Sequence, residues 1–227
     1  MISTWHAPQG DGTTSEELLI AFDRSRDRRV LVLPALFDEA NKLRRFTIEV
    51  MRALDQAGID CFLPDLPGQN ESLSPLERQD LSAWREAARA AAIQCNATET
   101  LSIRAGALIA PTELPGTAYA PISGAKLLRA MIRARLIASQ EAGIDENSQG
   151  LSAAARDKGI ILAGWPISAS MFRELEAADG QVAPPRVAID HKTIGGRGLW
   201  LRAEPDEDTA QSQAVAMMVA ERSGASS

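Results

Sequence analysis

Residues 101–111, "LSIRAGALIAP", have the residue spacing of a site for nucleophilic catalysis. Ser102, Arg104 and Gly106 fall on the small, central and small positions of the nucleophile elbow G-x-S-x-G, whose serine attacks a carbonyl carbon. Arginine cannot take that role, because its guanidinium stays protonated and offers no lone pair. The sequence therefore predicts a turn that keeps the place of an elbow and lacks its nucleophile.

A general base is the second part that this chemistry needs. His191 is the only histidine after the elbow, which makes it the candidate base. Its neighbour Asp190 would orient it poorly, because adjacent residues of a strand point to opposite faces, unless a turn lies between them. The alternative is an exposed loop histidine with no catalytic role.

Other nucleophiles have structural interpretations. Ser102 lies inside a predicted strand, whereas Ser72 and Ser123 are typical of turns and helix caps. Cys61 and Cys95 fit small core positions in a strand and an Ala-rich helix. None of the five has a histidine in evident reach.

The helix that should follow an elbow is curtailed. Residues 107–110 are all that separates the turn from "PTELPG", whose prolines cannot continue a helix interior. We expect at most one helical turn here. So short a helix gives little support to an oxyanion through its N–H groups and dipole.

Alternating strands and helices surround this turn. Apolar spacing predicts, in order, a strand at 28–36, a helix at 38–57, a strand at 59–64, an Ala-rich helix at 81–95 and a strand at 98–106. Short links between them favour a parallel sheet with right-handed crossovers. Further strands are expected at 117–122, 159–167, 181–192 and 198–205, with helices at 125–142, 168–180 and 208–221 and a polar loop at 143–150.

Composition bounds the class of protein. The 227 residues, 45% hydrophobic, suit one domain over 1–227, with frayed ends at roughly 1–14 and 222–227. A net charge of −6 argues against nucleic-acid binding. No run is long and apolar enough to span a membrane, and no signal segment is evident, which favours a cytoplasmic protein with reduced cysteines. We expect no metal site and no cofactor, because neither ligand spacing nor a glycine-rich phosphate loop is present.

Several segments together resemble a known family. "VLVLPALFDEANKLRRFTIEVMRALDQAGIDCFLPDLPGQNES" is similar to the N-terminal half of an α/β-hydrolase, and more narrowly to the hydrolase-like proteins associated with the exosortase A system. "YAPISGAKLLRAMIRARL", "LAGWPISASMFRELEA" and "GLWLRAEPDED" resemble later parts of the same family. The resemblance is discontinuous and spans most of residues 28–220. The motif residues are Pro34, Asp38, Glu39, Asn41, Lys42, Arg44, Arg45, Asp65, Leu66, Gly68 and Ser72.

This resemblance implies a three-layer α/β-hydrolase-like fold, with a mostly parallel sheet, helices on both faces and no evident cap domain. Related proteins can also carry arginine at the central elbow position. The resemblance and the missing nucleophile together predict a catalytically degenerate protein, a binding or accessory component of exosortase or exopolysaccharide systems. The alternative is an active hydrolase or acyltransferase for an ester, thioester or amide, with a non-standard nucleophile. Whether the chain is an enzyme stays open at this point.

A charged cluster is the candidate binding site. Its residues flank the first strand–helix loop, at the sheet edge where Arg104 should emerge and where open α/β sheets bind ligands. We predict that Arg104 pairs with Asp38 or Glu39, as a structural relic or as a recognition site for a small anionic or polar ligand. For Arg44 and Arg45 a solvated helix face is the alternative. A second copy of the chain or another protein is a further possible partner. The binding candidates are Asp38, Glu39, Asn41, Arg44, Arg45 and Arg104.

Overall fold

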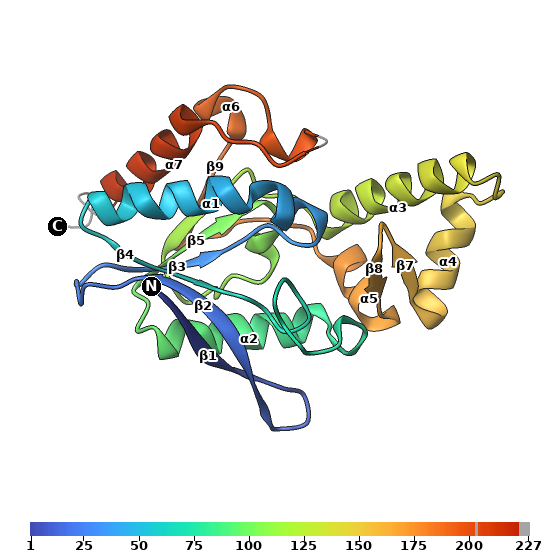
Figure 1. Cartoon of the computed structure of the whole chain (residues 1–227), viewed down its shortest axis with the longest axis horizontal. Helices are drawn as coiled ribbons and strands as arrows, with labels where there is room; N and C mark the ends of the chain where they lie inside the picture. The colour runs from blue at the N-terminus through green and yellow to red at the C-terminus, as the bar shows by residue number, and fades with distance from the viewer. Residues whose placement is uncertain (203, 223–227) are drawn as a thin grey trace.

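A seven-stranded sheet forms the centre of the molecule (Figure 1), in a computed structural model that describes residues 1–202 and 204–222. The first two strands form an antiparallel hairpin, which pairs antiparallel with β4, and the remaining pairs are parallel. In spatial order the strands are β1 (Ile2–Pro8), β2 (Thr14–Phe22), β4 (Asp60–Pro64), β3 (Arg29–Leu33), β5 (Glu99–Ile103), β6 (Gly116–Tyr119) and β9 (Arg186–Ile189).

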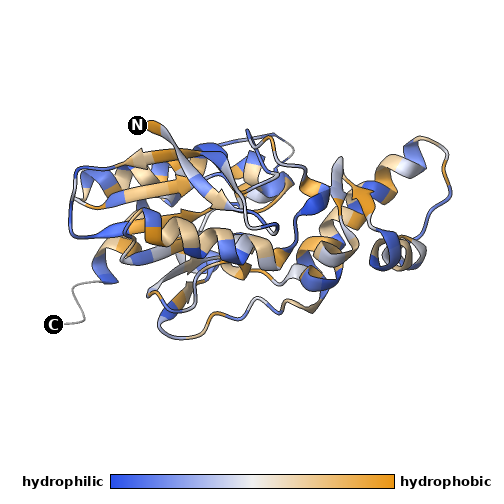
Figure 2. Cartoon of the chain, turned by 90° about the horizontal axis from the view of Figure 1, so that it is seen from below, coloured by the Kyte–Doolittle hydropathy of each residue, from blue (hydrophilic) through white to orange (hydrophobic). Residues whose placement is uncertain are grey.

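Helices cover both faces of this sheet. On one face lie α1 (Asp38–Gln56) and α7 (Thr209–Glu221), which pack against each other. On the other face lies α2 (Leu81–Gln94), whose Trp84 is fully buried. Hydrophobic and hydrophilic residues lie side by side along the helices (Figure 2). In α1 the buried residues recur at three- and four-residue spacing, as expected for an amphipathic helix that covers a sheet with one side only. The predicted three-layer arrangement is confirmed.

The chain between β6 and β9 forms a helical extension at one end of the molecule (Figure 1). Its buried side chains, among them Leu127, Met131 and Phe172, belong to the same hydrophobic cluster as Trp84 of α2. The extension therefore packs as a continuation of the helix layer on that face. Its elements are α3 (Gly124–Glu141), α4 (Ser148–Lys158), β7 (Ile160–Leu162), β8 (Trp165–Ile167) and α5 (Ala169–Ala177).

The expectation of a frayed start over residues 1–14 is wrong for most of that segment. Residues of β1 pair with β2 along their whole length. Trp5 is 3% exposed and its indole N–H donates to the Asp65 carbonyl, which fixes the strand to the core. At the other end, Arg222 closes α7, and residues 223–227 of the predicted frayed tail lie outside the described residues.

Three other local predictions were wrong in ways that turn chemistry explains. The single strand expected at 159–167 is a hairpin, because Ala163 and Gly164 both have positive φ and make its tight turn. The late strand expected at 198–205 is instead a 3₁₀ turn over Leu199–Leu201. The polar loop expected at 143–150 ends early, since Asn147 caps α4 by accepting the Gly150 N–H.

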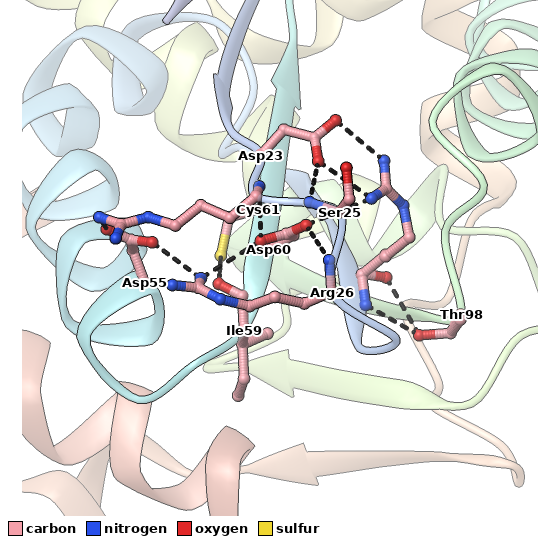
Figure 3. Close-up of polar contacts among 10 residues, drawn as sticks. Asp23, Ser25, Arg26, Asp55, Ile59, Asp60, Cys61 and Thr98 are labelled. Carbon is pink, nitrogen blue, oxygen red and sulfur yellow. Dashed lines mark hydrogen bonds and ion pairs between the residues drawn. The ribbon is translucent and has the colours of Figure 1, made fainter.

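An ion cluster around the buried Asp60 holds the opposite, amino-terminal ends of the parallel strands (Figure 3). Asp60 begins β4, is fully buried, and accepts the backbone N–H groups of Arg24 and Arg26 at 3.1 and 2.9 Å. The guanidinium groups of Arg26 and Arg29 add contacts at 3.2 Å. Arg29 also binds Asp23, and this hydrogen bonding lowers the pKa of Asp23 to about 2. The cluster ties the β2–β3 loop to β4 and has a structural role.

Candidate functional site

The predicted elbow is present as a backbone feature. β5 ends at Ile103, and Arg104 has φ 54°, in the left-handed region that residues with a Cβ rarely adopt. A single 3₁₀ turn, Arg104–Leu108, follows it, so the curtailed helix is confirmed. Gly106 is required here, because a Cβ would lie 2.4 Å from the Pro34 carbonyl oxygen and 2.5 Å from that of Leu33. The turn therefore packs directly on the end of β3.

The guanidinium of Arg104 is held on three sides. Nε and Nη2 each donate at 3.0 Å to one carboxylate oxygen of Glu39, and Nη1 donates at 3.1 Å to the Ala120 carbonyl. Its Cζ lies 3.9 Å from the ring centroid of Trp200, a cation–π contact. Arg104 is only 6% exposed. The predicted ion pair with Asp38 or Glu39 is thus present, and Glu39 is the partner.

The rest of the predicted cluster does not join Arg104. Asp38 pairs with Lys42 at 2.8 Å on the surface of α1. Arg44 donates at 3.0 Å to Asp65, which is 1% exposed, so the solvated-face alternative is wrong for Arg44.

Arg45 and Asn41 make no contact with Arg104 through a hydrogen bond or an ion pair. Arg45, with a side chain 63% exposed, binds Glu207 at 2.6 Å. Asn41 is exposed, and its side chain makes no hydrogen bond to any described residue. A binding role for these two, and for Asp38 and Arg44, stays a prediction.

His191 lies beside the elbow site without an acid to orient it. Nδ1 is 2.7 Å from the Tyr119 hydroxyl, and the ring packs on Trp200 with centroids 4.8 Å apart. Its Nε2 is buried and has no hydrogen-bond partner among the described residues. Asp190 is turned away, because it caps α6 (His191–Ile194) by accepting the Lys192 N–H. The alternative of an exposed loop histidine is wrong, since the ring is half-buried and packed.

The remaining nucleophile candidates are engaged or inert. Burial raises the pKa of Cys61 to about 12 and that of Cys95 to about 11, which suppresses their thiolates. Ser102 is 1% exposed. Ser123 caps α3, and the Ser72 hydroxyl accepts the Gly68 N–H. Burial also raises the pKa of Tyr119 to about 12, so its phenolate is equally disfavoured.

Two aromatic residues that the sequence did not single out shape the site. Phe37 ends the loop after β3, has φ 55° and is fully buried against Trp84 and Trp165. In elbow enzymes this loop supplies one of the oxyanion N–H donors. Trp200 covers one face of Arg104. The place of Phe37 in the sequence, directly before the acidic start of α1, could have indicated that it lies at the site. No local sequence pattern indicated that Trp200 does.

A pocket of about 510 Å³ opens beside Arg104 at the carboxyl edge of the parallel strands. An adjoining cavity of about 400 Å³ shares Arg104, Lys126 and Trp200 with it and reaches His191. The walls of the larger pocket are mostly apolar, with charged groups at Arg104, at the start of α1 and at Lys126 of α3. They comprise Phe37, Ile122, Leu127, Ala130, Met131, Ala134, Ala163, Trp200 and Leu201, with Asp38, Glu39, Lys42, Arg104 and Lys126.

Two wider properties bear on these pockets. No cluster of three or more His, Cys, Asp or Glu side chains that could hold a metal ion occurs in residues 1–202 and 204–222. Within the same part of the chain, every helix is too short or too polar to cross a bilayer.

Similarity to solved structures defines the fold. The chain is similar to alpha/beta hydrolase domain-containing protein 10 from mouse, with 12% identity, 99% and 100% of the two chains covered and a TM-score of 0.56. It is also similar to DcsB in complex with a substrate analogue (12% identity, 98% and 99% covered, TM-score 0.56) and to the esterase domain of a Rhodothermus marinus protein (13%, 98% and 98%, 0.55). No protein-family model and no curated protein sequence matches the chain.

These likenesses establish an α/β-hydrolase fold over nearly the whole chain. Identities of 12–13% carry the fold alone. The chemistry of this chain has to be argued from its own residues.

Proposed function

We propose that this chain is a non-hydrolytic protein of the α/β-hydrolase fold that binds a small amphipathic ligand in the pocket beside Arg104. The observation that carries the proposal is the ion pair of Arg104 with Glu39. A group that is permanently protonated and held on three sides stands where the fold presents its nucleophile.

The site also lacks an oriented base and a full helix after the elbow, which supports the same proposal. His191 faces a tyrosine instead of a carboxylate, and the turn after Arg104 is too short to act as a helix dipole. The backbone strain at Arg104 costs about 1–2 kcal/mol. The pairing with Glu39 and the stacking on Trp200 offset that cost. The turn is therefore stable in its present, unreactive form.

The pocket lining indicates the class of ligand. The side chains from α3 that face the pocket are mainly aliphatic. Glu39 already neutralises Arg104, and Lys42 is paired with Asp38, which leaves Lys126 as a lining cation with no ion pair to any described residue. An apolar body with one anionic or polar head fits this arrangement, with the body along α3 and the head at Lys126.

A pocket-blocking variant tests the binding half of the proposal. ANS (anilinonaphthalene sulfonate) is an apolar ring system with one sulfonate, and we expect saturable ANS fluorescence with the native protein. Ala134→Trp fills the pocket from an exposed position on α3 and should abolish the signal. Ala138→Trp, one turn further along the exposed side of α3 and outside the lining, is the matched control and should bind normally. Equal binding by the two variants would contradict a ligand site here.

We further propose an accessory role for the chain. The sequence resemblance to hydrolase-like proteins of the exosortase A system supports a binding component of such a system, working in the cytoplasm. Co-purification of the tagged full chain with the products of neighbouring genes tests this part. Recovery of the chain alone, at a concentration where ANS still binds, would remove the accessory role and leave the ligand site.

An active hydrolase or acyltransferase is the second candidate. It is favoured by the left-handed backbone kept at Arg104 and by the unpartnered Nε2 of His191 in the adjoining cavity. Short-chain nitrophenyl esters and thioesters discriminate the two functions. Turnover that disappears on His191→Gln would establish the second, and no turnover above buffer supports the first.

A further inference from the structure

A second pocket, unrelated to the elbow, lies between α2 and the loops that follow η2 (Arg104–Leu108) and α5. Its volume is about 340 Å³, and it shares no lining residue with either cavity at Arg104. Three arginines line it: Arg85 and Arg89 from successive turns of α2, and Arg186 from the start of β9. This concentration of positive charge stands out in a chain whose net charge is −6.

Arg186 is a buried cation that forms no ion pair with any described residue, although the charge of Glu113 acts on it. The residue is 7% exposed, and Nη1 makes one long hydrogen bond, 3.3 Å, to the Ala107 carbonyl. Its Nε is fully buried with no hydrogen-bond partner, and no carboxylate pairs with it, among the described residues. Burial lowers the pKa of this guanidinium. A charge left in this condition is costly unless an anion joins it.

The two arginines of α2 add free donors on the same side. Arg85 uses Nε to bind the Leu108 carbonyl at 2.9 Å, which leaves its two terminal nitrogens without a hydrogen bond to any described residue. Arg89 meets Glu113 only at 3.6 Å, and both side chains are about half exposed. Asp179, the one acidic residue in the lining, accepts the Gln181 N–H at 2.9 Å. With Glu113 beside Arg89, three positive charges face two negative ones, so the pocket keeps an excess of one positive charge.

We propose that this pocket binds a phosphate group, either inorganic phosphate or the terminal phosphate of a small organic ligand. A phosphate monoester carries close to two negative charges at neutral pH and three strong acceptor oxygens. That negative charge complements the excess of positive charge in the pocket, and the fork of each guanidinium matches phosphate oxygens geometrically. One oxygen accepts from Nη2 of Arg186, which is outside the set of fully buried nitrogens and has no hydrogen bond to a described residue, and the others accept from Arg85 and Arg89. The pocket exceeds the size of a bare phosphate, which leaves room for an organic part.

Calorimetry with two phosphate probes tests the site on the full chain. Inorganic phosphate and phenyl phosphate are titrated at constant ionic strength, so that general screening cannot imitate binding. We expect saturable binding of at least one. Tighter binding of phenyl phosphate assigns the site to an organic monoester, and equal or tighter binding of inorganic phosphate assigns it to the free ion. Either ranking supports the proposal, whereas no binding of either probe at millimolar concentration overturns it.

Arginine variants connect the binding to this pocket. Arg186→Gln and Arg89→Ala should each weaken binding about tenfold or more, the loss expected for a charged hydrogen bond of about 1.5 kcal/mol. Arg89 is exposed, so its variant keeps the test decisive if replacement of the buried Arg186 prevents folding. Arg133→Ala, an exposed arginine on α3 outside this pocket, is the control and should bind as the native chain does. Equal loss in the control, or no loss in the two pocket variants, overturns the assignment. ANS binding beside Arg104 should be unchanged throughout, which separates this site from the proposed function.

Discussion

Arg104 and Glu39 form a two-point ion pair that joins the turn after β5 to the first turn of α1. Both bonds are 3.0 Å long, and the two side chains are 7% and 14% exposed. Such a pair fixes geometry as well as charge, because the planar guanidinium fits one orientation of the carboxylate. The pair holds the turn at which the elbow was predicted.

Breaking one half of the pair should cost stability. Glu39→Gln leaves a buried guanidinium without its counter-charge, and we expect the free energy of unfolding to fall by about 3 kcal/mol. Asp38→Asn is the matched control, because this neighbour is 55% exposed and its loss should cost less than about 1 kcal/mol. Urea denaturation measures both. Similar losses in the two variants would show that Arg104 does not depend on Glu39.

Removing both halves should cost less than removing one. In Arg104→Met with Glu39→Met, two apolar side chains replace the pair, and no buried charge remains. We expect the double variant to recover most of the loss of Glu39→Gln in the same denaturation experiment. Additive losses from the two single replacements would mean that the residues are not energetically coupled.

Gly106 should be irreplaceable in the elbow turn. A Cβ there meets two carbonyl oxygens of β3 and its loop at 2.4 and 2.5 Å, and backbone atoms cannot move aside easily. We predict that Gly106→Ala lowers the free energy of unfolding by at least about 2 kcal/mol. Gly10→Ala, which meets no atom within 4 Å, should change it by less than about 0.5 kcal/mol. Thermal unfolding distinguishes the two outcomes.

Acid should weaken the cluster at the opposite end of the sheet. The folded-state pKa of Asp23 is lowered to about 2, so its contribution is present above its ordinary pKa and is lost as pH falls through the folded value. Stability should therefore decline between about pH 5 and pH 2. Asp23→Asn should flatten part of this decline in acid titrations followed by circular dichroism. Asp27→Asn, an exposed neighbour, should leave the profile unaltered.

Both thiols should be unreactive in the folded protein. Burial raises the pKa of Cys61 and Cys95 to about 12 and 11, so neither forms thiolate near pH 8. A colorimetric disulfide reagent should label no cysteine in native buffer and both in denaturant. Fast labelling of either in native buffer would reopen the question of a cysteine nucleophile.

Local patterns predicted the parallel part of the sheet and the main helices, but not the hairpin of β1 and β2. The strand and helix periodicities of residues 28–106 correspond to β3, α1, β4, α2 and β5, because each element buries one continuous apolar set. The pairing of Arg104 with an acid at the start of α1 also followed, since parallel strands bring their carboxyl ends to one edge. The choice of Glu39 over Asp38 could not be predicted, because it depends on which side of the first helical turn faces the elbow.

The remaining features could not be predicted, mostly because they depend on contacts between residues far apart in the sequence. Trp200 reaches Arg104 across almost a hundred residues, and His191 meets Tyr119 across 72, so no local spacing marks either contact. The hairpin β7–β8 was hidden because an alanine, Ala163, takes a positive φ that usually indicates glycine or asparagine. The arginine pocket was missed for the same reason, since Arg186 joins Arg85 only through the fold.

Intact-mass spectrometry after incubation with a fluorophosphonate tests most directly whether the chain carries a reactive nucleophile. An active serine hydrolase treated in parallel provides the positive control. We predict that the full chain keeps its unmodified mass while the control gains one adduct. A stoichiometric adduct on this chain, mapped to a serine or tyrosine beside the pocket and lost when that residue is replaced, would contradict it.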